Sequence, residues 1–189
     1  MPNWCSNFLK VSGDIHELNK FKELTLVKPE KGDELNFTME ILYPTPADLL
    51  AETGSNPGWY DWRVNNWGTK WDVAESCIGL NTDTYLEISY DTAWGPNSAF
   101  IQYAAKAFPT LSFSLAYEEP GMGFCGLYEV TGHDEDLMEG ELEYQDEESG
   151  RAVHYDNTIH KYRFTDDNEI AGDVYEDYWP QQVNPFIKN

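Results

Sequence analysis

The clearest folding signal in the chain is an amphipathic segment between two proline boundaries, followed by an alternating segment. Apolar residues recur at i, i+1, i+4, i+7 and i+8, which is the stripe of an α-helix. These residues are Phe100, Ile101, Ala104, Ala107 and Phe108. Gly95-Pro96 precedes the helix and Pro109 ends it. Residues 111–117 then alternate between apolar and polar side chains, which predicts a half-buried strand.

The chain opens with a strand and a helix. Residues 7–13 alternate, which places Leu9 and Val11 on one side of the strand. Asp14 then caps a helix, and Glu17 is placed as the reciprocal partner of a capping box. We therefore expect a strand followed at once by a helix.

A helical insertion, residues 27–70, follows this first unit. It contains two predicted short helices, at about 46–52 and 57–66. Each begins at a proline that follows a polar residue able to cap the helix, Thr45 in the first and Asn56 in the second.

A predicted hairpin completes the order of elements. Two extended runs, 71–80 and 84–90, are joined by a short polar turn. With the insertion set aside, the elements follow the βαββαβ order of the ferredoxin-like fold, an α+β class. We assign residues 1–130 to this domain and residues 131–189 to an acidic, β-rich extension of the same domain. Alternating segments predict antiparallel strands near 126–131, 141–145, 152–155, 161–164 and 174–179.

Charge is the second strong constraint. The chain has 34 acidic and 12 basic residues, which gives a formal net charge of -22. Nine carboxylates and no basic residue fall between positions 134 and 148: Asp134, Glu135, Asp136, Glu139, Glu141, Glu143, Asp146, Glu147 and Glu148. A field of this sign repels nucleic acid and membrane surfaces and speeds the encounter with basic proteins. We therefore expect a basic protein partner, with no direct contact to nucleic acid or membrane.

The acidic run could also be interpreted as a cation site. A calcium loop needs an oxygen ligand at its fifth position, and the fifth residue from Asp134 is Met138. The histidines lack metal-ligand spacing, and Cys5, Cys77 and Cys125 are too far apart for a metal knuckle or a disulfide framework. We expect a solvated acidic loop, buried free thiols, and neither metal nor cofactor.

Catalytic motifs and targeting segments are both lacking. The sequence has no nucleophile elbow, phosphate-binding loop or recognisable pairing of cysteine with histidine. The N-terminal residues lack a basic start and an apolar run, and no stretch approaches the roughly 18 apolar residues of a membrane helix. We expect a cytoplasmic, non-enzymatic protein.

The insertion ends in a tryptophan-rich segment that allows two interpretations. It holds four of the seven tryptophans: Trp59, Trp62, Trp67 and Trp71. The spacing of Trp59, Trp62 and Asn66 places them on one helical face, as expected for packing against the sheet. The same indoles, with polar groups nearby, could instead form an aromatic groove for a peptide, a nucleobase or another ring.

Three ordered motifs carry a family resemblance. They are PNWCSN at 2–7, WYDWRVNNWGTKWD at 59–72 and YDTAWGP at 90–96. In these motifs the chain resembles the YubB ferredoxin-like family of prophage and plasmid proteins, related to the Api-type phage proteins, over about residues 1–130. The resemblance implies a ferredoxin-like domain and a mobile-element origin. It implies no established activity and no catalytic residues.

These observations favour a binding protein of a phage or plasmid. We expect its acidic surface to dock on a basic, nucleic-acid-binding protein, in the sharpest form as a DNA mimic or anti-defence inhibitor. The alternative is a small-molecule or peptide receptor that uses residues 59–71. The oligomeric state is left open.

Overall fold

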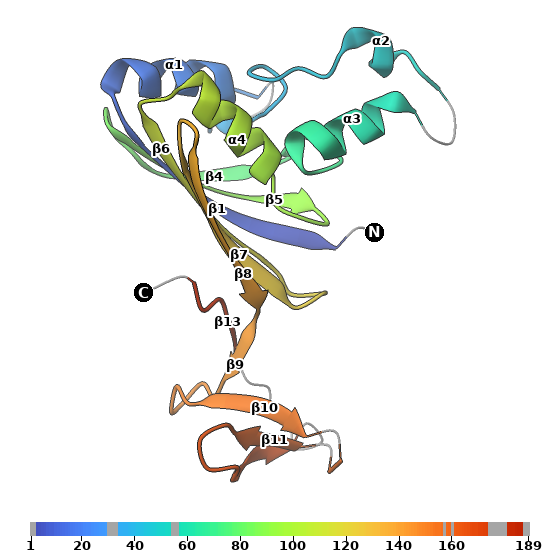
Figure 1. Ribbon diagram of the computed structural model, residues 1–189, viewed down its shortest axis with the longest axis vertical. Helices are drawn as coiled ribbons and strands as arrows, with labels where there is room; N and C mark the ends of the chain where they lie inside the picture. Colours follow the sequence, from blue (N-terminus) through green and yellow to red (C-terminus); the bar gives the residue numbers. More distant parts are fainter. Residues whose placement is uncertain are drawn as a thin grey trace.

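The six longest strands form one antiparallel sheet, which carries the ferredoxin-like order. In the computed structural model, which describes residues 3–29, 34–53, 57–156, 158–159, 161–173 and 181–186, the strand order is β4-β5-β1-β6-β7-β8 (Figure 1). The strands are β1 (Trp4–Gly13), β4 (Ser76–Asn81), β5 (Tyr85–Ala93), β6 (Leu111–Glu119), β7 (Phe124–Thr131) and β8 (Asp134–Glu141). Helices α1 (Ile15–Thr25) and α4 (Ser98–Ala107) complete the βαββαβ unit. The predicted α+β, ferredoxin-like fold class is confirmed.

The start of α1 is fixed by two carboxylates with different roles. Asp14 caps the helix, as predicted, because its side chain accepts hydrogen bonds from the backbone N–H groups of His16 and Glu17. The reciprocal half of the predicted capping box is wrong. The Glu17 carboxylate accepts instead from Thr110, at 3.0 Å from its backbone N and 2.7 Å from Oγ1. This contact ties the start of α1 to the turn before β6.

The insertion between α1 and β4 contains four short elements. They are β2 (Leu26–Val27), β3 (Asn36–Phe37), α2 (Ala47–Leu50) and α3 (Gly58–Trp67). Thr45 does not cap α2, because its hydroxyl donates to Glu40 and accepts from Arg63. Asn56 lies outside the described residues. The first strand of the hairpin begins at Ser76, later than predicted, because the preceding residues connect the insertion to the sheet.

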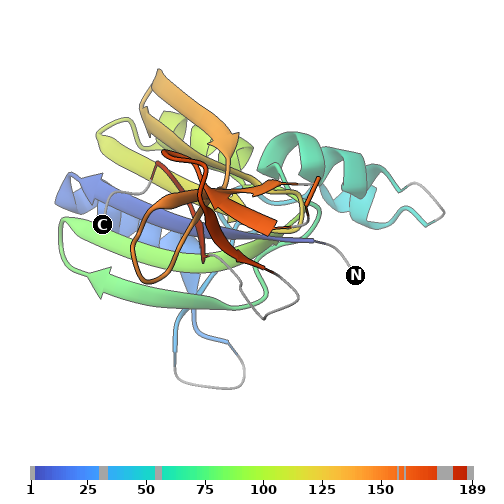
Figure 2. The same cartoon turned by 90° about the horizontal axis from the view of Figure 1, so that it is seen from below.

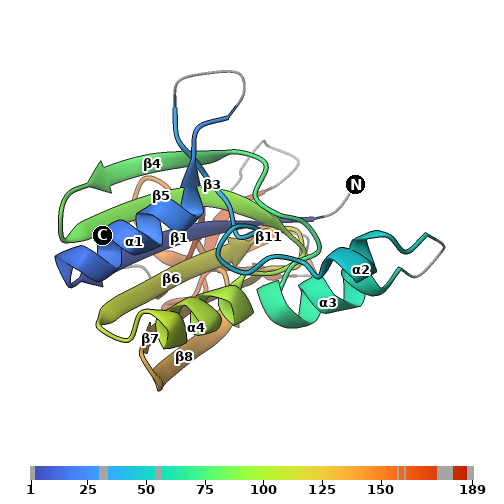
Figure 3. The ribbon, with the colours of Figure 1, turned by 90° about the horizontal axis from the view of Figure 1, so that it is seen from above.

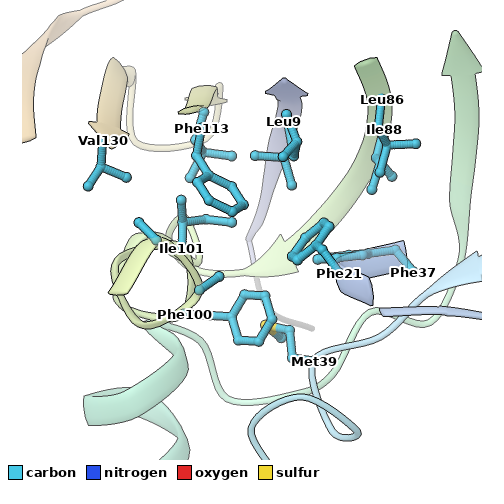
Figure 4. Packing of buried hydrophobic residues seen from close by; sticks show 14 of the residues in the cluster. Leu9, Phe21, Phe37, Met39, Leu86, Ile88, Phe100, Ile101, Phe113 and Val130 are labelled. Carbon is cyan, nitrogen blue, oxygen red and sulfur yellow. The ribbon is translucent and has the colours of Figure 1, made fainter. Parts of the chain in front are cut away.

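The hydrophobic core lies between the sheet and the helices. Figure 3 shows α1 and α4 lying across one face of the sheet, with α2 and α3 beyond one end of it. Side chains on alternate positions of the strands, such as Leu9 and Phe113, point toward Phe21 of α1 and Phe100 of α4 (Figure 4). The Phe21 and Phe113 rings meet edge to face at 5.4 Å between centroids. The opposite face of the sheet, here called the open face, has no helix on it (Figure 3).

The C-terminal segments form a second sheet on the side of the main sheet opposite the helices (Figures 1 and 2). The strand order of this second sheet is β12-β11-β10-β9-β13. It lies below the open face of the main sheet (Figures 1 and 2). Its strands are β9 (Glu143–Gln145), β10 (Ala152–Asp156), β11 (Lys161–Phe164), β12 (Ile170–Asp173) and β13 (Gln181–Val183). The strand predicted at 174–179 lies outside the described residues. After β13 the chain returns to the main sheet, where the Asn184 side chain donates to the backbone oxygen of Tyr117 at 3.0 Å.

Candidate functional site

The first half of the acidic run is a strand at the edge of the main sheet. Residues 134–141 were expected to be a loop, and this expectation is wrong: they form β8, paired with β7 along its whole length. Because side chains alternate along a strand, the pairing directs Glu135 and Glu139 to the helix side and Asp134 and Asp136 to the open face.

Two β8 carboxylates bind the hydroxyl groups of buried tyrosines. The Tyr128 hydroxyl donates to Glu135 and the Tyr117 hydroxyl donates to Glu139, each at 2.6 Å. Gln102 of α4 also donates to Glu135, at 2.8 Å. Hydrogen bonds from Tyr128 and Gln102 lower the pKa of Glu135 below its ordinary value. Burial, and then the bond to Glu139, raise the pKa of Tyr117. These carboxylates therefore attach β8 to the core.

The main sheet as a whole is acidic. Its six strands, all described, contain ten acidic residues and one basic residue, Lys10. The open face receives Glu87 and Asp91 from β5, Glu118 from β6 and Glu129 from β7, in addition to the two aspartates of β8. Within the described residues, no ion pair involves a carboxylate of β8. We call β8 together with these open-face carboxylates the acidic surface.

The other four predicted acidic residues belong to the second sheet. Glu143 begins β9, and Asp146, Glu147 and Glu148 form the turn that follows it. The Asp146 carboxylate accepts from the backbone N–H and the hydroxyl of Ser149. The nine predicted residues are thus divided between an edge strand and a turn.

Ion pairs in the second sheet and the insertion involve other carboxylates. Arg151 pairs with Asp166 and Asp167, and Arg163 pairs with Asp156 at 2.8 Å. In the insertion, Arg63 pairs with Glu40 at 3.2 Å. The described ion pairs therefore lie outside the acidic surface.

The four tryptophans of the predicted aromatic groove do not share one surface. Trp67 is completely buried, and its Nε1 donates to the backbone oxygen of Tyr43 at 2.9 Å. Trp62 packs edge to face on Trp67, and Trp59 is partly buried with the Arg63 guanidinium 5.3 Å from its ring centroid. These contacts of the three indoles are with other residues of the insertion, not with the open side of the sheet that the packing interpretation predicted.

Trp71 lies instead in an exposed cluster that the fold assembles from three segments. It approaches Trp4 of β1 and Trp94, which follows β5, with 6.3 Å between centroids in both pairs. Lys70 Nζ lies 4.6 Å from the Trp71 ring centroid, 5.3 Å from that of Trp94 and 5.5 Å from that of Tyr60. We call these five residues the indole cluster.

The backbone of Trp94 is held in an unusual conformation. Its φ is 70°, in the left-handed region that side chains other than glycine rarely adopt. Its N–H donates to the backbone oxygen of Asn3 at 2.9 Å. On either side of it, Thr69 exchanges hydrogen bonds with the backbone of Ala93, and the Thr92 hydroxyl donates to the oxygen of Gly95. These contacts fix the backbone from which the indole projects.

The fold and the geometry agree with what comparison finds. A family model described as the ferredoxin-like domain in Api92-like protein matches residues 66–169, more than half of the chain. The chain belongs to the Api92-like family. The crystal structure of protein Api92 from Yersinia pseudotuberculosis is similar, with a TM-score of 0.58 at 11% identity over 75% of this chain and 98% of that chain. A likeness at this identity shows a shared fold alone. No curated protein matches the chain.

The thiols and potential metal ligands of this Api92-like chain can be compared with the sequence predictions where the structure describes them. Cys5 and Cys125 are buried and free, as expected, whereas Cys77 is exposed because it lies on the open face of the edge strand β4. Burial raises the pKa of the Cys5 thiol to about 12. No group of three or more potential metal ligands comes together in the described parts of the chain. The helices among the described residues are all too short or too polar to cross a membrane.

Sequence reasoning missed two of the three exposed indoles of the Api92-like chain. Trp4 and Trp94 were noted as parts of motifs, and only Trp71 was named as a site residue. The available signal was that each of the three family motifs contains at least one tryptophan. Periodicity could not reveal that the exposed indoles meet, because the three segments meet only through the pairing of β1 with β5 and the course of the insertion.

Proposed function

We propose that this Api92-like protein is a non-enzymatic binding protein whose acidic surface docks on a basic protein. The observation that carries the proposal is the ratio of ten acidic residues to one basic residue in the main sheet. Carboxylates that outnumber the neighbouring cations this strongly create a negative field that extends over about 8–10 Å at physiological salt. Such a field attracts a basic surface and orients it before contact.

The charge density of β8 helps to define the partner. Its eight residues span roughly 27 Å at about 3.4 Å per residue and carry five carboxylates, so charges recur about every 5 Å. One strand of duplex DNA carries a charge about every 3.4 Å along the axis. The lower density supports docking on a basic protein more strongly than close imitation of a duplex.

The narrower proposal concerns origin and role. The YubB-like motifs of the chain favour a mobile-element origin, and basic surfaces on host proteins are often nucleic-acid-binding sites. We therefore propose a nucleic-acid-binding protein as the partner, with inhibition of a host defence as the role and the cytoplasm as the place of action.

The test is capture of partners from host lysate on the immobilised protein at low and high salt. The key variant carries Asp134→Asn, Asp136→Asn and Glu141→Gln, three exposed β8 residues without a hydrogen bond to a tyrosine. We expect the unmodified protein to enrich a basic protein at 50 mM NaCl and to lose it at 500 mM, because salt screens the attraction.

A matched control removes the same charge elsewhere. Glu23→Gln, Glu34→Gln and Asp61→Asn neutralise three exposed carboxylates outside the main sheet, so both triple variants have a net charge of -19, from -22 + 3. The control should capture the partner as well as the unmodified protein, whereas the β8 variant should not. Equal capture by both variants, or no basic protein enriched at either salt, contradicts the proposal.

A further inference from the structure

The indole cluster is an apolar surface that the fold leaves in contact with water. Trp4, Trp71 and Trp94 are 47%, 37% and 45% exposed. Large indoles dominate the energetics of binding surfaces because each can remove a large apolar area from water. Here three exposed indoles from three separate segments lie next to each other, which is typical of a recognition surface.

Lys70 gives this surface a charge opposite to that of the molecule. Its Nζ lies near three ring centroids, and no carboxylate among the described residues lies within ion-pair distance of it. The ammonium group of lysine carries three hydrogen-bond donors. The aromatic rings attract its charge but offer no oxygen or nitrogen acceptor to these donors. Lys70 is therefore placed to receive an anionic group beside an aromatic surface.

We propose that the indole cluster binds a small planar aromatic anion, with the ring on an indole and the anionic group on Lys70. A charge-assisted hydrogen bond from Nζ to the anion would be about 2.7–2.9 Å long. Since Nζ is 4.6 Å from the Trp71 centroid, one compact molecule can make both contacts. The site does not depend on docking through the acidic surface.

Other ligand classes fit less well. A cationic ligand would meet Lys70 at the same ring faces. A nucleic-acid strand would bring many phosphates against a net charge of -22, whereas a small molecule brings one group to the local cation. A neutral ring or sugar would leave Lys70 unused. A ligand that combines one negative charge with an aromatic ring is therefore the class that would contact both the indoles and Lys70.

The ring spacing determines how the ligand binds. A ring inserted between two indoles would need centroids about 7 Å apart, twice the contact distance of about 3.5 Å. The pairs here are 6.3 Å apart, so the ligand stacks on an outer face of the cluster. The hydrogen bonds around Trp94 hold its backbone in place before binding, which lowers the entropy cost of association.

The test is a titration of the full chain, labelled with 15N, followed by the indole N–H signals. Adenosine 5′-monophosphate and indole-3-acetate are the probes, and adenosine and ribose 5-phosphate lack the charge and the ring respectively. We expect saturable shifts of the Trp4, Trp71 and Trp94 signals with at least one anionic probe. If only adenosine 5′-monophosphate binds, the site prefers a phosphate, and if only indole-3-acetate binds, it prefers a carboxylate. Binding of both probes shows that it accepts either group.

Charge-removing variants distinguish the site from general adsorption. Lys70→Met should weaken binding at least tenfold, Lys70→Arg should stay within a few fold, and Lys106→Met on α4 should have no effect. The signal of buried Trp67 reports whether each variant is folded. No shift with either anion, equal binding of adenosine, or unchanged binding by Lys70→Met would overturn the proposal.

Discussion

Trp67 is the side chain around which the insertion packs. It has no exposed surface, it donates one hydrogen bond to Tyr43, and the Arg63 guanidinium lies 4.7 Å from its ring centroid. Trp59, eight residues earlier on the same helix, is only partly buried. The same residue type therefore has a structural role at one position and a peripheral one at the other.

Replacing these two tryptophans by phenylalanine should separate the roles. Trp67→Phe should lower the free energy of unfolding by about 2–3 kcal/mol, because it leaves a cavity and removes the hydrogen bond to the part-buried carbonyl of Tyr43. Trp59→Phe should cost less than about 1 kcal/mol. Urea unfolding followed by circular dichroism measures both, and equal losses would contradict the assignment of Trp67 to the core.

The end of α3 is set by a glycine that also allows a close approach. Gly68 has a φ of 86°, and a Cβ at this position would lie 2.6 Å from the backbone oxygen of Pro96. Gly123, between β6 and β7, has a φ of 74°, but a Cβ there would meet no described atom within 4 Å. The two glycines share a backbone conformation and differ in their surroundings.

Alanine at each glycine should therefore cost different amounts. Gly123→Ala should destabilise by about 1 kcal/mol, the cost of a left-handed conformation with a side chain. Gly68→Ala should lose about 3 kcal/mol or more, because the contact with Pro96 forces the helix end to move. Thermal and urea unfolding test this, and similar losses at both positions would show that the contact is not important.

The elements differ in how far the sequence predicts them. The helix around Phe100 and the strands with alternating apolar residues could be predicted because their buried faces are hydrophobic. β8 could not, because carboxylates occupy both its faces and its link to the core is a pair of bonds from Tyr117 and Tyr128. A hydrophobic pattern contains no information about which tyrosine hydroxyl a carboxylate will bind. The indole cluster was missed for a related reason, since its members meet only in the folded chain.

Net charge acts on the whole molecule. A net charge of -22 makes the folded chain repel itself, and the unfolded chain relieves that repulsion by expanding. The ion pairs of Arg63, Arg151 and Arg163 offset only part of it. Stability should thus depend on ionic strength more than in a protein of balanced charge.

Salt should stabilise this protein. Raising NaCl from 20 to 300 mM shortens the screening length and should increase Tm by roughly 3–8 °C, the shift that about 1–2 kcal/mol produces in a chain of this size. Scanning calorimetry measures the shift. The β8 triple variant should respond less than the unmodified protein. A Tm that falls or does not change with salt would show that self-repulsion is negligible.

The position of β8 at the rim of the main sheet has a consequence for behaviour in acid. One side of β8 offers N–H and C=O groups that β7 does not use, and an exposed strand of this kind can pair with another copy of the chain. Ionised Asp134, Asp136 and Glu141 keep such copies apart near neutral pH. Because hydrogen bonds lower the pKa of Glu135, the stability it contributes is present above its ordinary pKa and is lost as pH falls through the lowered value. As the pH approaches the isoelectric point of about 4.2, the net charge of the chain approaches zero, and edge-to-edge aggregation becomes the expected fate of the protein; the attachment through Glu135 weakens as the pH falls further.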